Sequence, residues 1–533
     1  MEMQSETLGR IKVSTVPMPV EMAGFFSGTY THSGRVLVAG KTVTDPQDKD
    51  WYRVFTMEDD GTDVCTLFTG EIPQKQGANG IRWMCYPDNK RILLGDYVLE
   101  CEPDLDHCTQ AKLVEVQYPK ELMERRDIFM HWSEIIIAPD NVHMCWTALT
   151  MTGAVCYMGR LVKKEVEGKE SYELEDTSIV SSLVPYLPDP ENPGFVLEQP
   201  VRGGEVKQFV KGGRALSVVG NGTSIAESVV QFLDSEEMLQ ITNTPGYEET
   251  TMFSPDETLG VVMSPRFSTK TNCNIFGLVP QPYSMPTRGK MINILYMYCV
   301  AGVRAFRKGN VGPALIEIEG SMKEGRNYKG VDLSDPAGEY VYYSPISWHP
   351  GSTKAMWNEG TRVAAGDQKF RLQICELLDR KPGEPVAAGT TPDSAQIPYA
   401  QPLSAKEVPV EYPVKIKGKH SGYVENICTQ GEGNPVFETV YHEFSDDGQT
   451  FMEGWMRVQA AASLFAPGKT VFETDLTVRG THTGEMKLKA VFDRESVHAP
   501  AMLQLGMGED GLPISRGYAS YDGETLKIED MEA

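Results

Sequence analysis

Residues 246–265, GYEETTMFSPDETLGVVMSP, hold two runs of alternating apolar residues separated by the turn Ser254-Pro255-Asp256. This pattern predicts an antiparallel β-hairpin, because proline presets the backbone of the turn and the aspartate side chain bonds to it. The hairpin pattern recurs, in two copies without the proline, around Ser33, Pro87, Pro139, Lys211 and Pro350. Successive turns are 44 to 95 residues apart.

A period near 50 residues with about four strands per unit predicts a β-propeller, because one four-stranded blade cannot cover its own faces. The repeat resembles that of the TolB-like propeller family over roughly residues 24–380. Six blades are expected, with seven as the alternative, since the 95-residue gap after the fifth turn has room for another. We favour an insertion there, at about 281–312, with a short buried helix or an irregular cover. Residues 1–23 are expected to supply a strand that closes the ring.

The chain is therefore expected to be all-β, with a propeller in residues 1–380 and a second domain in residues 412–533. Residues 381–411 between them are rich in proline and alanine, which predicts a flexible linker open to proteases. Strictly alternating segments follow the linker and predict a small antiparallel β-sandwich or barrel. We expect this second domain to pack against the propeller, because a small isolated sandwich is only marginally stable.

Composition excludes several classes of protein. The net charge of -24 argues against nucleic-acid binding, which needs a basic surface. The longest apolar run, residues 291–303, is too short to span a membrane, and the first 24 residues lack a secretory signal. The ten cysteines show no CxxC pair, which favours a reduced, cytoplasmic protein. Motifs of serine hydrolases, zinc proteases and nucleotide-binding enzymes do not occur. The oligomeric state stays open.

The first strand of each propeller blade lines the central channel, so residues shortly before each turn should surround one mouth. On this alignment the expected catalytic residues are His131, Glu205, Glu249 and Tyr343. The expected substrate-binding residues are Asn79, Arg82, Lys207 and Glu248. Such a set suits general acid–base catalysis, and the alternative is a polar funnel that holds only water. Carboxylates near His131 should keep its imidazole protonated to higher pH, and their mutual repulsion should raise a carboxyl pKa.

The channel is also distantly similar to that of the oligogalacturonate lyases, which are cytoplasmic propellers. That resemblance implies a sugar-like substrate and a divalent metal held at the channel mouth by several histidines and a glutamine. Only His131 stands in a comparable position here, so the metal ligands are left open and no other cofactor is assigned. A second candidate metal group, Cys101–Cys108, is expected to be an exposed loop instead.

The expected function is that of a lyase acting on a small polar or sugar-like molecule in the channel. Proton removal needs a base, for which His131 and Tyr343 are the candidates, and a cation for the developing negative charge, either Arg82 or Lys207. The alternative is a non-catalytic binding or scaffold protein that uses the propeller faces and the C-terminal domain to hold partners.

Overall fold

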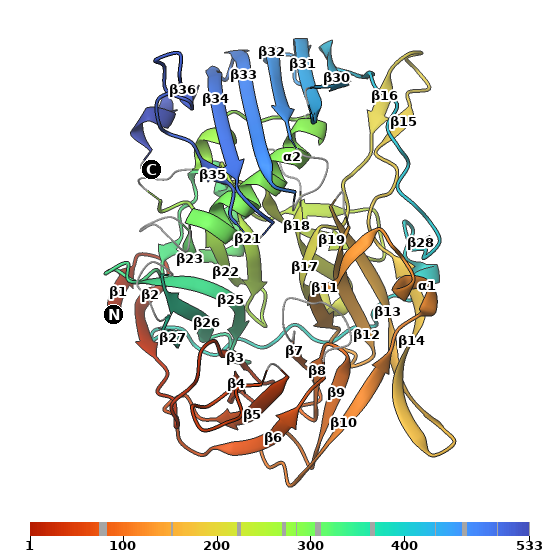
Figure 1. Ribbon diagram of the computed structural model, residues 1–533, viewed down its shortest axis with the longest axis vertical. Helices are drawn as coiled ribbons and strands as arrows, with labels where there is room; N and C mark the ends of the chain where they lie inside the picture. The colour runs from red at the N-terminus through yellow and green to blue at the C-terminus, as the bar shows by residue number, and fades with distance from the viewer. Residues whose placement is uncertain are drawn as a thin grey trace.

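The computed structural model describes residues 1–48, 50–73, 83–150, 153–220, 225–268, 273–283, 285–303, 311–362, 368–431, 433–460, 466–497 and 499–531. They form a mostly β structure in which six antiparallel sheets of at least four strands precede one larger sheet (Figure 1). The expectation of a β protein built from repeated four-stranded antiparallel sheets is confirmed.

The first three sheets follow the chain in order. The first contains β3 (Ser27–Tyr30), β4 (Val36–Gly40), β5 (Trp51–Met57) and β6 (Cys65–Glu71). The second contains β7 (Trp83–Cys85), β8 (Arg91–Leu94), β9 (Tyr97–Glu102) and β10 (Gln110–Gln117). The third contains β11 (Ile128–Ile137), β12 (His143–Thr150), β13 (Ala154–Val166) and β14 (Lys169–Ile179). A short parallel pairing of β10 with β14 joins the second and third sheets.

The next three sheets have the same order. The fourth contains β17 (Glu205–Val210), β18 (Ala215–Gly220), β19 (Glu227–Phe232) and β20 (Met238–Gln240). The fifth contains β21 (Glu249–Phe253), β22 (Leu259–Ser264), β23 (Gly312–Glu317) and β24 (Val331–Asp332). The sixth contains β25 (Tyr340–Trp348), β26 (Lys354–Thr361) and β27 (Phe370–Leu377), to which the N-terminal strands β2 (Gly9–Thr15) and β1 (Glu2–Ser5) are added. The expected closing strand is thus β2, which pairs with β27.

Neighbouring sheets pack face to face all the way round. The second strands β4, β12, β18 and β22 are buried along their whole length, as short continuous apolar runs predict. Separate apolar clusters fill all six interfaces, including the one between the sixth sheet and the first. Each sheet therefore buries both of its faces, and the six together make a closed ring.

The six predicted turns share one backbone feature. In each, a residue next to the Pro-Asp position has a left-handed backbone: Gly34, Asn89, Asn141, Gly212, Glu257 and Ser352. Several of these residues also bond to the turn before them. The Asn141 Oδ1 accepts the Asp88 amide at 2.8 Å, and the Ser352 Oγ accepts the Asp256 amide at 3.1 Å. The turns therefore tie adjacent sheets together.

Short elements occupy the connections. Helix α1 (Lys120–Met123) precedes the third sheet, the hairpin of β15 (Tyr186–Pro188) and β16 (Val196–Glu198) follows it, and helix α4 (Ile318–Glu324) lies within the fifth. The 3-10 turns are η1 (Lys211–Gly213), η2 (Cys273–Phe276), η4 (Gly325–Asn327), η6 (Ser394–Gln396) and η7 (Ile528–Asp530). All ten cysteines are free thiols. None of the described helices is long and apolar enough to cross a membrane.

The C-terminal region, expected to be a sandwich or a barrel, has a single sheet and not the two separate sheets of a sandwich. Its strands form one nine-stranded antiparallel sheet: β29 (Val414–Lys417), β30 (Ser421–Gln430), β31 (Pro435–Ser445), β32 (Thr450–Gln459), β33 (Gly468–Gly480), β34 (Gly484–Arg494), β35 (Met502–Leu503), β36 (Arg516–Tyr521) and β37 (Glu524–Lys527). Helix α2 (Met285–Leu295) and the π-helical segment η3 (Tyr296–Val303) cover its apolar face (Figure 1). The second layer is therefore helical and comes from the insertion within the fifth sheet.

This helical cover joins the C-terminal sheet to the ring. The Phe276 ring lies 6.0 Å from the Phe472 ring, and the Tyr298 ring lies 5.4 Å from the Phe492 ring. One apolar cluster runs from the fifth and sixth sheets through α2 and η3 into the C-terminal sheet. The expectation that this region packs against the propeller-like part is confirmed, although the contact passes through the insertion.

The linker also differs from its expected form. It runs across the ring toward β28 (Gln401–Pro402), which pairs with β14 (Figure 1). On the way, the Val386 amide donates to the Pro255 carbonyl at 2.8 Å and the Gly389 amide donates to the Gly212 carbonyl at 2.7 Å. A side chain at Gly212 would meet the Ala387 carbonyl oxygen at 2.4 Å. Proline and alanine content predicted a free tether, but backbone bonds to the turns hold the linker in place.

A histidine fastens the far part of the linker. His143 Nδ1 lies 2.6 Å from Asp140 and its Nε2 lies 3.0 Å from Asp393 on the linker, with Arg160 3.7 Å from the same Asp393 carboxylate. Burial opposes protonation of His143, but the two carboxylates outweigh it and raise its pKa. The imidazole therefore bridges the third sheet and the linker, and both carboxylates favour its protonated form.

The turn residue Asn141 offers a test of the ring of turns. Replacing Asn141 with Ala should lower the free energy of unfolding by about 2 kcal/mol, because alanine resists the left-handed backbone and the bond to Asp88 is lost. Asn141→Gly keeps the backbone freedom and should cost about half as much. Chemical denaturation measures both, and equal losses in the two variants would show that the backbone conformation contributes nothing.

The His143 bridge offers a second test. A group with a raised folded pKa stabilises the fold below its unfolded pKa, about 6.5 for histidine, and this contribution is lost as pH rises through the folded pKa. His143→Gln should therefore speed proteolysis within residues 381–399 at pH 6, and the ratio of variant to wild-type rates should fall toward one at pH 9. A second variant, Asp393→Asn, removes the charge of the linker partner and should also speed cleavage at pH 6. An unchanged rate at pH 6 would mean that the bridge does not fasten the linker.

Candidate functional site

A cavity of about 840 Å³ lies inside the ring of sheets. The first strand of every sheet contributes to its wall, through Thr29, Met84, Glu134, Lys207, Met252 and Ser344. Linker residues Pro385, Val386 and Ala388 line it as well. The cavity has the size of a typical small-molecule site.

Four charged residues meet at one part of this wall, and we call them the Lys207 cluster. The Lys207 Nζ lies 2.9 Å from Glu205, 3.3 Å from Glu249 and 3.4 Å from Glu134. The carboxylates come from three sheets, since Glu134 is on β11, Glu205 on β17 and Glu249 on β21. The Ser133 hydroxyl donates to Glu205 at 3.0 Å.

β-Bulges aim these side chains inward. The pairing register of the first strand shifts between Met130 and Glu134 in β11, and around Lys207 in β17. Similar shifts follow Glu249 in β21 and Tyr343 in β25. A bulge re-aims a side chain and is common beside active sites. The bulges in β11, β17 and β21 bring the side chains of the Lys207 cluster together.

Burial and charge compete at Lys207. Only 3% of its side chain is exposed, and burial alone would lower the pKa of the ammonium. The carboxylates of Glu205, Glu134 and Glu249 outweigh burial and hold the Lys207 pKa well above its usual range. The lysine is therefore a fixed cation. Glu134 is the most exposed member, with 25% of its side chain accessible, and it faces the cavity.

The predicted convergence of Glu205 and Glu249 with a third residue occurs, but the third residue is Lys207 and not His131. His131 is half-buried, its ring lies 5.9 Å from that of Trp132, and its Nδ1 has no hydrogen-bond partner among the described residues. Burial lowers the His131 pKa, opposite to the expected direction. His131 lies in the irregular stretch of β11, where the pairing register shifts between Met130 and Glu134, whereas Glu134 begins the regular pairing with β12.

The other predicted site residues are placed as follows. Tyr343 does not line the cavity; its ring packs 6.1 Å from Phe370, and the neighbouring Ser344 lines the wall instead. Glu248 is fully buried and accepts two bonds from the Arg266 guanidinium, at 2.7 and 2.8 Å. Asn79 and Arg82 lie outside the described residues.

Sequence reasoning missed Glu134, although a signal was present. It is the one charged residue in the run from His131 to Ala138, directly before three isoleucines. A carboxylate at the start of a buried strand needs a partner, because burying an unpaired charge is costly. Lys207, already expected in the channel, is that partner.

The cavity wall does not fit the divalent metal that the lyase resemblance implied. His32 is the one histidine among the described wall residues, and the carboxylates surround the Lys207 ammonium. That ammonium already takes the position of a cation among three carboxylates. No step below depends on a metal.

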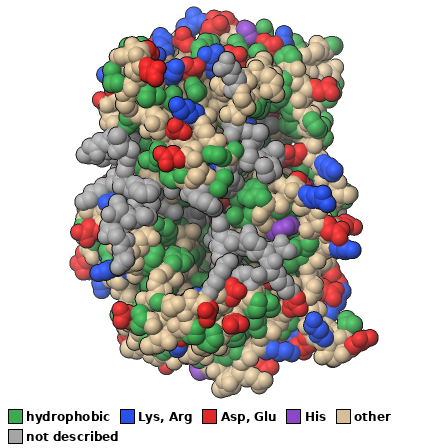
Figure 2. Space-filling model, viewed as in Figure 1, with side chains coloured by type: hydrophobic (Ala, Val, Ile, Leu, Met, Phe, Trp, Pro, Cys, Tyr) green, Lys and Arg blue, Asp and Glu red, His purple; other side chains and the backbone are tan. Residues whose placement is uncertain are grey.

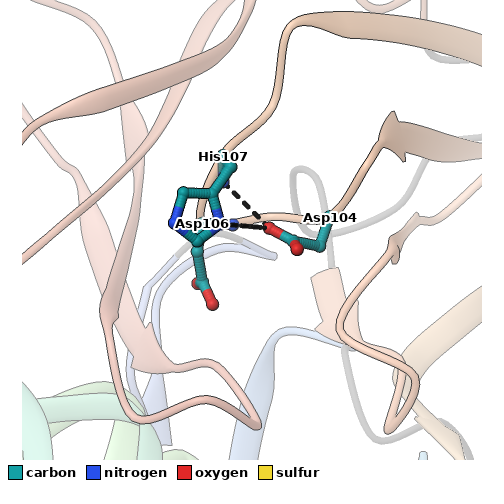
Figure 3. A group of neighbouring side chains, drawn as sticks. All are labelled: Asp104, Asp106 and His107. Atoms are coloured by element: carbon teal, nitrogen blue, oxygen red, sulfur yellow. Dashed lines mark hydrogen bonds and ion pairs between the residues drawn. The ribbon is translucent and has the colours of Figure 1, made fainter.

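In the loop at residues 101–108, the candidate metal ligands bond to one another and to neighbouring turns. Asp104, Asp106 and His107 lie close together, and Asp104 accepts bonds from the His107 ring and backbone (Figure 3). The Asp106 carboxylate accepts Ser33 at 2.7 Å and Asn89 at 3.0 Å. These bonds fasten the loop to the turns of the first two sheets, as an exposed structural loop requires.

A second buried group of charges lies between the fourth and fifth sheets. Glu227 is fully buried near the Glu248–Arg266 pair, and its carboxylate accepts the Thr242 hydroxyl at 2.6 Å. Burial, followed by the negative charge of Glu248, raises the Glu227 pKa well above its usual range. The folded protein therefore favours the protonated form of the Glu227 carboxyl group.

On the face seen in Figure 2, acidic and basic side chains are interspersed. The excess of acidic residues, 74 against 50 lysines and arginines, is not gathered into one patch there. This face therefore gives no sign of a binding surface for a polyion.

Glu227 predicts how stability varies with pH. Above about pH 4.5 the unfolded chain loses the Glu227 proton while the folded protein keeps it, so the free energy of unfolding falls as pH rises toward the folded pKa. Glu227→Gln should remove this slope. At pH 8 its free energy of unfolding should be at least about 1 kcal/mol higher than that of wild type. Denaturant titrations at pH 5, 6, 7 and 8 measure the slope. The same slope in both proteins would show that Glu227 ionises normally.

No protein-family model and no curated protein matches the chain. Among solved structures it is distantly similar to a protein of Agrobacterium tumefaciens assigned as TolB, with 11% identity over 61% of this chain and 87% of that one and a TM-score of 0.32. TolB from Acinetobacter baumannii has 12% identity over 69% of this chain and 66% of its own, with a TM-score of 0.28. Prolyl oligopeptidase B from Galerina marginata has 10% identity over 80% of this chain and 46% of its own, with a TM-score of 0.25. At these identities none of the three assigns an activity to the chain.

Proposed function

We propose that the six sheets are the blades of one six-bladed propeller and that its central channel, the cavity described above, binds a small polar molecule. Three features support the propeller: the ring of six apolar interfaces, the closing pair of β2 and β27, and the first strand of every sheet at the cavity wall. The cavity volume of about 840 Å³ suits a small molecule and not a protein partner.

The Lys207 cluster is the observation that carries this proposal. Moving one ammonium and three carboxylates out of water is costly. An axis filled only with water would not need these four charged groups. Buried charge clusters in a cleft are typical of functional sites. A polar funnel or a pure scaffold has no use for such an arrangement, so a ligand site is the better explanation.

Acid–base catalysis in the channel is the reaction class that we propose, with Glu134 as the base in place of His131 and Tyr343. Glu134 and Lys207 both line the cavity, and Lys207 fixes the position of Glu134 from 3.4 Å away. In a carbon–oxygen lyase, Glu134 would take a proton from carbon, the C–H electron pair would form the double bond, and the C–O bond would break. The leaving oxygen would take its proton from water in the channel.

Metabolite capture tests this proposal. Purified protein is incubated with a cell extract of small molecules, and the bound and transformed compounds are identified by mass spectrometry. We expect wild type to enrich a compound and to convert it to a product lighter by the leaving group, and Glu134→Gln to lose both effects. The matched control is Glu257→Gln, whose carboxylate lines the same cavity but is held by Lys211 at 2.9 Å.

The outcomes are distinct. Enrichment without conversion would keep the binding site and reject the lyase. Equal enrichment by wild type and Glu134→Gln would reject the assignment of the site to the Lys207 cluster. The thermal melting temperature of each variant confirms that the fold is retained.

A further inference from the structure

We infer that the ligand of the channel carries a cationic amine on an apolar, ring-bearing body, with the amine seated against Glu134. This inference rests on the proposed function, because it names the class of molecule that the same cavity would hold. It differs from the sugar-like substrate that the lyase resemblance implied.

The charge of the Lys207 cluster gives the first step. One ammonium faces three carboxylates, and it lies closest to Glu205, at 2.9 Å, and farthest from Glu134, at 3.4 Å. Of the three carboxylates, Glu134 is the one among the described wall residues, where Lys207 also lies. Its carboxylate therefore presents a negative potential to anything bound there, and in a partly dry cavity this potential is weakly screened. A cation next to Glu134 is favoured, and an anion is repelled.

The rest of the wall gives the second step. Aromatic rings from several sheets line the cavity, namely Phe25, Tyr52, Trp83, Phe209, Phe253 and Trp348. Trp348 is fixed, because its indole N–H donates to the Met252 carbonyl at 2.8 Å. Apolar rings recognise an apolar body through burial, and their faces also attract a cation.

The other charged groups on the wall do not change this conclusion. Lys41 donates to the Asp48 carbonyl and lies 6.0 Å above the Tyr52 ring, at the edge of the first sheet. Glu257 is paired with Lys211 at 2.9 Å. Each is therefore engaged locally, whereas Glu134 is partly exposed and shares its counter-ion, Lys207, with two other carboxylates. The amine position follows from Glu134.

Three matched probes test the ligand class: 2-phenylethylamine, 2-phenylethanol and 3-phenylpropanoate, which share a ring and differ in charge. Isothermal titration calorimetry on the full chain at pH 7 should show the amine binding at least tenfold more tightly than the alcohol, and no binding of the carboxylate. Glu134→Gln should weaken binding of the amine at least tenfold and leave the affinity for the alcohol unchanged, since glutamine keeps the shape of the side chain and removes its charge. Glu257→Gln should bind all three as wild type does.

Two results would overturn the inference in different ways. Tighter binding of the alcohol or the carboxylate, or equal amine affinity in Glu134→Gln, would reject the cationic class and keep the channel as a ligand site. Failure of all three probes to bind would also reject the amine class. If metabolite capture found no ligand either, the proposed function itself would fall.

Discussion

The fold depends on one constraint, which is that every sheet in the ring has two apolar faces to bury. The second strands β4, β12, β18 and β22 are buried along their whole length, so no sheet has a face suited to water. A ring satisfies this constraint for all six sheets at once, whereas any open stack would leave two faces exposed. Closure needs a strand from the other end of the chain, and the pairing of Val13 with Cys375 supplies it.

The ring in turn creates the site. Six sheets around an axis leave a space that their first strands line, and β-bulges in four of these strands decide which side chains enter it. The members of the Lys207 cluster depend on one another, because removing one partner of a buried ion pair leaves an uncompensated charge at a cost of about 3–5 kcal/mol. The cluster is therefore stable only when three sheets hold it together, and this requirement links the candidate chemistry to the closure of the ring.

Two segments outside the sheets complete the molecule. The linker crosses the turns and adds Pro385 and Val386 to the cavity wall, so it belongs to the ligand site as well as to the chain connection. The insertion within the fifth sheet provides the apolar layer under the C-terminal sheet. Tyr247, whose ring lies 6.4 Å from that of Tyr296 in the insertion, sits two residues before Glu249. The C-terminal region is thus connected to the cavity through packed side chains.

The sequence alone determined what short-range chemistry controls. A left-handed residue marks each turn, with Pro-Asp before it in three of the six, and alternating or continuous apolar runs specify the strands, so the repeated sheets and the closing strand were predictable. Lys207 lines the cavity and Glu205 and Glu249 contact it, because each of the three starts or nearly starts a first strand. Only the tertiary structure decided the rest. Glu134 and not His131 lines the cavity, Glu248 is paired with Arg266 in the core, and backbone bonds to the turns hold the linker. These outcomes depend on residues far apart in the chain, whose partners are set by packing between sheets and leave no local pattern.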